Sequence, residues 1–255
     1  MMRIVMLFIL ILVFGLFQTV RGQSPEAETA YLAGRYDAAF ADVAADRGAD
    51  ACAFGARMLL AKAMSGDVQP PPVLVLAALD AANRALVAEP EHVEGRLQKA
   101  IALSLLARPM SLKEARDSGL GVEARDLAEA VLEDDPQNAY AHGFLAVWHV
   151  EVLNRGGLLG AMILGASMEE AERHYVAAMQ ASAADAALHW QYARALAALN
   201  ARKYRKEVAA ALDAALAAPV GSELERVMKE RARVLSEAAA TANSRDVEAL
   251  AESMF

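Results

Sequence analysis

The side chains with the greatest chemical potential lie in the middle of the chain. His142 and His149 are seven residues apart, so on a helix they share one face, and Glu151 follows closely. Two helical turns separate the two imidazoles, however, and no further ligand type is spaced to complete a zinc site. His174 and His189 are isolated in the sequence. We therefore expect no metal ion and no cofactor at these residues.

Catalytic motifs receive little support from the sequence. The tripeptide His149-Val150-Glu151 matches a fragment of the zinc-deaminase motif, but the paired cysteines of that motif are absent, because Cys52 is the only cysteine. No glycine-rich phosphate loop follows a strand pattern, and no nucleophile elbow is present. We therefore expect a protein without enzymatic activity.

The elements that must position these side chains are helices. The chain of 255 residues is 56% hydrophobic, contains only 8 prolines and is rich in Ala, Leu and Glu, which predicts an all-α fold. Serine followed three residues later by glutamate marks predicted helix starts at Ser111, Ser167 and Ser222. Pro70-Pro71-Pro72 predicts an extended connector, which we interpret as a spacer more readily than as a partner-binding motif.

Small residues recur at helical spacing before a proline, as in a repeat. The residues that carry this pattern are Ala78, Ala82 and Ala85 before Pro90, Ala124, Ala128 and Val131 before Pro136, and the large–small pairs Leu145-Ala146 and Tyr192-Ala193. Small side chains on one helix face allow a neighbouring helix to approach closely. The pattern therefore predicts a stack of helical hairpins.

These residues resemble the tetratricopeptide (TPR) repeat over most of the chain after residue 24. The resemblance implies a right-handed α-solenoid of TPR-like helical hairpins with a C-terminal capping helix, and a function in binding. Pro90 and Pro136 are farther apart than the roughly 34 residues of one repeat, which indicates enlarged hairpins. In layout the chain is similar to the periplasmic T-component of tripartite substrate transporters and, more loosely, to the regulator of microtubule dynamics family.

A candidate binding groove follows from the faces that the first helices of two hairpins should turn inward. Aromatic rings supply contact area at low entropic cost, and one arginine with one glutamate would fix the orientation of a peptide or a small amphipathic molecule. At any single aromatic position, ordinary core packing is the alternative. The predicted groove residues are Tyr140, Phe144, Val147, Glu151, Trp190 and Arg194.

A glycine-rich apolar insertion is predicted at residues 154–166. Gly156, Gly157, Gly160 and Gly165 surround the apolar residues Leu158, Leu159, Met162 and Ile163. We expect these apolar residues to pack over the hairpin core, with a ligand surface or a subunit interface as the alternative. No Lys or Arg lies between Gly156 and Met168, which argues against contact with a bilayer surface.

The predicted domains are residues 1–22, 23–242 and 243–255. Arg3 and the apolar run that follows it predict an export signal cleaved before Gln23, or an uncleaved anchor as the only membrane contact. Residues 23–242 would form the TPR-like repeat domain, and residues 243–255 a short helix or a frayed tail, with docking on the stack or on another subunit preferred over disorder.

Composition and resemblance together favour an exported, periplasmic binding scaffold for a protein or peptide partner, or one anchored to the inner membrane and facing the periplasm. The net charge of −8 argues against nucleic acid. The alternative is an accessory protein of a membrane transporter that carries a small apolar ligand in a cavity bordered by Leu158, Leu159, Ile163 and Trp190. A homo-oligomer is compatible with either interpretation.

Overall fold

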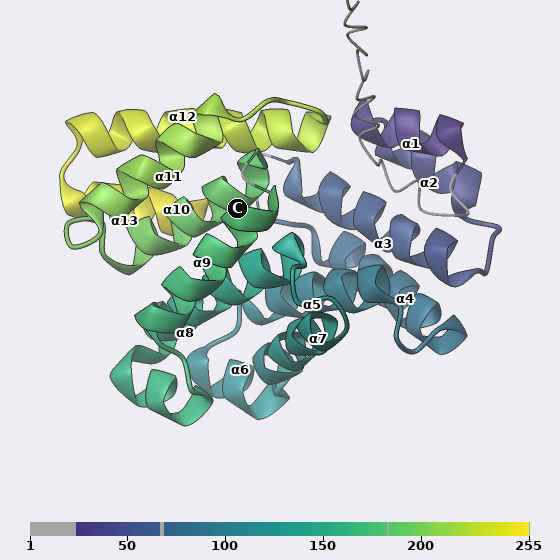
Figure 1. The fold of residues 1–255 in the computed structure, drawn as a ribbon, viewed down its shortest axis with the longest axis horizontal. Coiled ribbons are helices and arrows are strands. Elements are labelled where there is room, and N and C mark those ends of the chain that lie inside the picture. Colours follow the sequence, from purple (N-terminus) through teal and green to yellow (C-terminus); the bar gives the residue numbers. More distant parts are fainter. Residues whose placement is uncertain (1–23, 67–68, 183, 255) are drawn as a thin grey trace, which may run out of the picture.

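The structure is a computed structural model that describes residues 24–66, 69–182 and 184–254. The predicted signal or anchor at residues 1–22 lies outside these ranges. Within them, thirteen helices are the regular elements and no strand is present, which confirms the all-α class. In chain order the helices are α1 (Pro25–Leu32), α2 (Tyr36–Val43), α3 (Ala49–Met64), α4 (Pro72–Ala88), α5 (Val93–Ala107), α6 (Leu112–Ser118), α7 (Leu120–Asp134), α8 (Ala139–Leu164), α9 (Met168–Ser182), α10 (Ala186–Asn200), α11 (Arg205–Ala217), α12 (Glu223–Thr241) and α13 (Ser244–Ser253) (Figure 1).

The predicted helix starts follow cap chemistry. Ser111 forms a complete capping box with Glu114, and Ser222 Oγ accepts the Glu225 N–H. Ser167 Oγ accepts the Glu170 N–H at 3.1 Å, but the N–H of Ser167 itself donates to His149 Nδ1. The extended connector is shorter than predicted, because Pro72 is already the first residue of α4. Proline is tolerated there because the first helical position needs no N–H donor.

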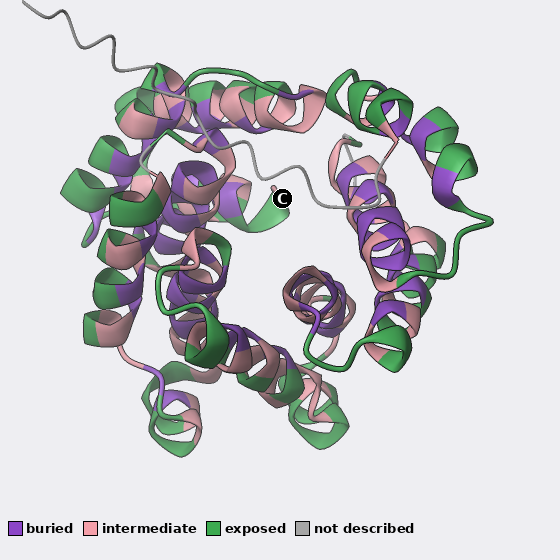
Figure 2. Ribbon diagram, turned by 45° about the vertical axis from the view of Figure 1, so that its right-hand side comes forward, coloured by how far each residue is buried: buried purple, intermediate pink, exposed green. Residues whose placement is uncertain are grey.

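Consecutive helices pack against one another along the chain, for example α3 on α4, α4 on α5, α8 on α9 and α10 on α11. The small residues of the predicted repeat pattern lie in these contacts. Figure 2 shows the buried residues on the faces that helices turn toward each other. The fully buried pattern residues are Ala78, Ala82, Ala85, Ala124, Ala128, Val131, Ala146 and Ala193.

The carboxyl-terminal helices return to the beginning of the chain. Arg231 of α12 donates to the carbonyl oxygens of Met64 and Gly66 at 2.8 and 2.6 Å, just after α3. Helix α13 packs on α10 and buries Val247 and Ala251. The carboxyl end therefore lies among the helices in both ribbon views, and the tail docks on the helices of its own chain (Figures 1 and 2).

The predicted insertion at 154–166 is largely helical. Helix α8 consists of two helical segments that meet at a kink, because Gly157 has the non-helical angles φ 58° and ψ −160°, and the second segment ends at Leu164. Leu, Met and Ala are strong helix formers, and glycine alone can adopt this backbone conformation at the kink without a Cβ clash. Even so, no helix among the described residues is both long and apolar enough to cross a membrane.

Candidate functional site

Two of the six predicted groove residues are buried. Trp190 is completely buried in the core that α10 shares with α11 and α12, so its ring is not available to a partner. Arg194 has only 2% of its surface exposed. The prediction that Trp190 lines a groove is therefore wrong, because Trp190 lies in a core cluster to which α8, α11, α12 and α13 also contribute buried residues.

The four predicted groove residues of α8 lie nearer the surface. Tyr140, at the start of the helix, is 56% exposed, whereas Phe144 and Val147 are half-buried and pack against the core. Burial of the hydroxyl and the nearby Asp185 raise the pKa of Tyr140, so it stays a neutral phenol. Val147 packs against the core to which α10 contributes, whereas Phe144 packs against residues of α5 and α7.

Glu151 and Arg194 form the strongest polar contact between α8 and α10. Arg194 Nη2 donates to Glu151 Oε1 at 2.5 Å, and Arg194 Nε donates to Gln191 Oε1 at 3.2 Å. Burial would raise the pKa of Glu151, but Arg194 and then Arg108 outweigh it and hold this pKa below its ordinary value. The structure thus brings together two predicted groove residues as an ionised pair.

One atom of this pair is left without an acceptor. Arg194 Nη1 is buried and makes no hydrogen bond. A buried donor without a partner costs about 1–3 kcal/mol and is rare in native proteins. The side chain of Glu151 keeps 23% of its surface exposed, so the pair lies directly beneath the protein surface. An added acceptor could satisfy this donor once the atoms that cover it move aside.

Two further arginines lie at the same end of α8. Arg108 donates to the carbonyl oxygens of Glu252 and Met254 at 3.0 and 3.1 Å, and Arg155 donates to those of Ala107 and Met110. Burial lowers the pKa of Arg108 to about 10, and the positive charge of Arg194 adds to this effect. Three guanidinium groups thus act on the carboxylate of Glu151, and Glu252 places a second carboxylate near Arg108.

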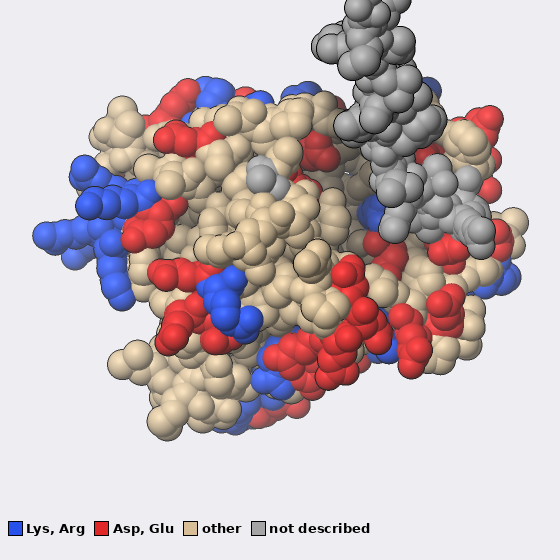
Figure 3. Space-filling model, viewed as in Figure 1, with Lys and Arg blue, Asp and Glu red and all other residues tan. Residues whose placement is uncertain are grey.

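The apolar residues of the predicted insertion are on the surface. Leu158 is 88% exposed, and Leu159, Met162 and Ile163 are also exposed at the end of α8. This end is largely free of charged residues, as Figure 3 shows at its lower left. The prediction that these four residues pack over the core is wrong, because the helix beyond Gly157 projects past its neighbours. They also lie in a different region from buried Trp190, so the four residues named for the carrier's cavity do not border one cavity.

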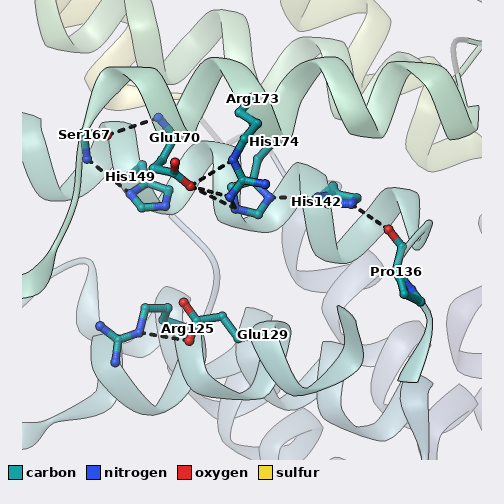
Figure 4. A network of polar contacts seen from close by, with 9 residues as sticks. All are labelled: Arg125, Glu129, Pro136, His142, His149, Ser167, Glu170, Arg173 and His174. Atoms are coloured by element: carbon teal, nitrogen blue, oxygen red, sulfur yellow. Dashed lines mark hydrogen bonds and ion pairs between the residues drawn. The ribbon is translucent and has the colours of Figure 1, made fainter. Parts of the chain in front are cut away.

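A histidine cluster occupies the other side of α8, where it faces α9 (Figure 4). His142 Nδ1 and His174 Nδ1 are 2.8 Å apart, and His142 Nε2 is 3.1 Å from the carbonyl oxygen of Pro136. The ring of His149 stacks on that of His174 with centroids 5.8 Å apart. All three rings are buried.

Two charged residues of α9 complete the histidine cluster. Arg173 bonds to the carboxylate of Glu170, and its Nη2 lies 3.2 Å from His174 Nε2. Burial lowers the pKa of His174 to about 4, with Arg173, His142 and His149 adding to the effect. Burial also lowers the pKa of His149, whereas the bond from Arg173 lowers that of Glu170. Near neutral pH, His149 and His174 are therefore uncharged and Glu170 is a carboxylate.

Part of this arrangement differs from what the sequence predicts. His174 is not isolated, because it bonds to His142, and His189 bonds to the hydroxyl of Tyr175 at 2.7 Å. Glu170, His174 and His149 each offer a ligand atom to the same point, although no metal site was expected. The spacing of Glu170 and His174, four residues on one helix face, was the signal available in the sequence.

No protein-family model matches this chain, and no curated protein matches it.

Proposed function

We propose that this chain is a non-enzymatic binding scaffold of the cell envelope, built as an α-solenoid of TPR-like hairpins, that binds a carboxylate group of a protein or peptide partner at Arg194. The observation that carries the proposal is the buried Arg194 Nη1 without an acceptor. Guanidinium groups form charge-assisted hydrogen bonds with carboxylates, as with phosphates, and Nη1 of Arg194 could donate one such bond. Export through residues 1–22, to the periplasm or to an inner-membrane anchor, belongs to the same proposal.

The surroundings of Arg194 suit an anionic partner. Arg108 and Arg155 add positive charge beside Glu151, so a second carboxylate could approach without net repulsion. Tyr140, Phe144 and Val147 offer partly exposed apolar surface along α8. A partner that carries a carboxylate next to apolar side chains, such as an acidic peptide or a peptide carboxyl terminus, matches both features. A small carboxylate-bearing ligand would meet the same donor and is the alternative.

The first experiment is native mass spectrometry of the mature protein purified gently from a periplasmic extract, repeated after denaturation. A bound mass that carries a carboxylate, released on denaturation, is the expected result. Arg194→Lys keeps the charge but removes the planar fork, so it should lose the bound mass. Arg233→Lys is the matched control, since Arg233 pairs with Glu230 and Glu237 on the exposed surface of α12.

Peptide binding then separates the two partner classes. The free acid of an acidic peptide and its amidated form are compared by fluorescence anisotropy with wild-type protein and both variants. Preference for the free acid that disappears in Arg194→Lys, but persists in Arg233→Lys, supports the proposal. A folded Arg194→Lys variant that retains the partner at wild-type affinity would contradict it.

A further inference from the structure

We infer that His149, Glu170 and His174 form a binding site for one divalent transition-metal ion, best matched by Zn²⁺. Their three ligand atoms all lie within 4.8 Å of one another. Two imidazole nitrogens and a carboxylate oxygen are a ligand set that zinc accepts, with a fourth position left for water. Tetrahedral zinc with bonds of about 2.1 Å holds its ligand atoms about 3.4 Å apart, so small side-chain rotations would close the site. The inference is independent of the function proposed above.

The backbone already presents the three ligands to one point. Glu170 and His174 are one turn apart on α9, and His149 comes from α8, which packs along α9. His149 and His174 are buried, and Glu170 is half-buried at the surface. The ligands therefore come from rigid helices with the carboxylate on the solvent side, through which an ion can enter.

The hydrogen bonds of His142 fix which nitrogen of His174 is free to bind a metal ion. A carbonyl oxygen only accepts, so His142 Nε2 donates its hydrogen to Pro136 O at 3.1 Å. In the neutral pair, His142 Nδ1 must then accept, and His174 Nδ1 donates to it across 2.8 Å. The lone pair of His174 is consequently on Nε2, the nitrogen that faces Glu170 at 4.0 Å. Metal-binding histidines are typically oriented by such a bond from the other ring nitrogen.

His149 is held less tightly than His174. Its Nδ1 accepts the Ser167 N–H at 3.4 Å, which is longer than an ordinary N–H···O or N–H···N bond. Giving up this bond costs little, and the ring can then turn a lone pair toward the metal position. His149 is thus the ligand that adjusts, whereas His174 is fixed in advance.

Arg173 holds the metal position closed in the absence of an ion. Its guanidinium bonds to the Glu170 carboxylate and lies 3.2 Å from His174 Nε2. Two of the three ligand atoms are therefore in contact with Arg173 instead of a metal ion. The side chain of Arg173 is 58% exposed and can swing into solvent. On the side of α7, Arg125 is already paired with Asp126 and Glu129. Arg173 is therefore the cation that competes most directly with a metal ion.

The test uses the full mature chain without a histidine tag, stripped with EDTA and titrated with Zn²⁺ against a fluorescent chelator. We expect one ion per chain, lost in His149→Gln and His174→Gln and weakened in Glu170→Gln. Loss of the orienting bond in His142→Phe should weaken binding about 10- to 100-fold while the stoichiometry stays at one. Removal of the competing cation in Arg173→Met should strengthen binding. Titration with Co²⁺ should give the absorption bands of a four-coordinate ion.

The matched control is His92→Asn, which changes a histidine outside the cluster. His92 caps α5 by accepting the Gly95 N–H, a role that Asn can also fill. This variant should bind Zn²⁺ like the wild type, and circular dichroism checks the fold of every variant. Arg173→Met alters only a largely exposed side chain. Its effect on Zn²⁺ affinity therefore still tests the inference if a histidine variant does not fold. Absence of saturable binding below millimolar Zn²⁺, or equal affinity in folded His174→Gln, would overturn the inference.

Discussion

Helix α8 buries polar groups on two sides in two different ways. Toward α10 it presents Glu151, whose charge is maintained by Arg194 and by neighbouring arginines. Toward α9 it presents His142 and His149, whose cluster contains an uncharged His174. Burial of a charged pair has a large desolvation cost, and removal of one partner leaves the other as an uncompensated buried charge. Neutral imidazoles have a smaller desolvation cost, and their nitrogen lone pairs stay available. The first side is therefore suited to an anion and the second to a cation.

Of the polar substitutions, removal of Arg194 should have the largest effect on stability. Arg194→Met leaves Glu151 as an uncompensated, largely buried carboxylate, so we expect a loss of about 3 kcal/mol, the lower end of the usual range because Arg108 and Arg155 remain. Urea unfolding at neutral pH measures it. In the double variant with Glu151→Gln both charges are gone, so much of the loss should be recovered. If Arg194→Met alone loses less than about 1 kcal/mol, the buried charge of Glu151 is not costly, and the contrast between the two sides of α8 does not hold.

Acid should affect the histidine side at a higher pH than the glutamate side. His174 titrates with a pKa of about 4 when folded and near 6.5 when unfolded, so the unfolded chain binds more protons between these values. The free energy of unfolding should therefore fall as the pH drops from 6.5 toward 4, by at most about 3 kcal/mol. The depressed pKa of Glu151 gives stability that is present above about 4.5 and is lost at lower pH.

Urea unfolding in EDTA at several pH values between 7 and 4 separates these two contributions. His174→Gln should reduce the slope between pH 6.5 and 4.5, because glutamine does not titrate, and His149, whose pKa burial also lowers, should account for the slope that remains. Glu151→Gln should leave that slope in place. An unchanged slope in His174→Gln would show that the acid sensitivity arises elsewhere in the chain.

Helix positions could be predicted from the sequence more readily than the partners of their side chains. Cap residues act locally, so the helix starts predicted at Ser111, Ser167 and Ser222 are the starts of α6, α9 and α12. The burial of Trp190 could not be predicted, because it depends on how α8, α11, α12 and α13 pack around α10. The contact between His142 and His174 likewise depends on the register of α8 against α9. Local chemistry thus gave the elements, and tertiary packing decided the sites.

Substitution of Gly143 in α8 tests the close packing between α8 and α10, on the side of α8 that contacts Arg194. A Cβ added at Gly143 would lie 2.4 Å from Leu188 Cδ2 of α10, a side-chain tip that can turn aside. We expect Gly143→Ala to lose about 1 kcal/mol, because the strain outweighs the helix propensity gained. Gly160→Ala, where no atom lies within 4 Å, is the control and should gain stability. Zinc binding on the α9 side should be the same in both variants, and a change in it would show that the two sides are coupled.

The exposed end of α8 should contribute least to the stability of a single chain. Leu158 and Met162 are 88% and 74% exposed, so the double substitution Leu158→Ser and Met162→Ser removes little buried area and should shift the free energy of unfolding by less than about 0.5 kcal/mol. Leu145→Ala, at a residue only 1% exposed on the same helix, should cost about 2–5 kcal/mol by comparison.

Urea unfolding at low and high protein concentration tests whether the exposed end of α8 is a self-association surface. If copies of the chain associate through this end, the wild type will be stabilised at high concentration and the double variant will not, because association stabilises only the folded state by mass action. Equal stability of both proteins at every concentration would instead exclude this end as a self-association surface.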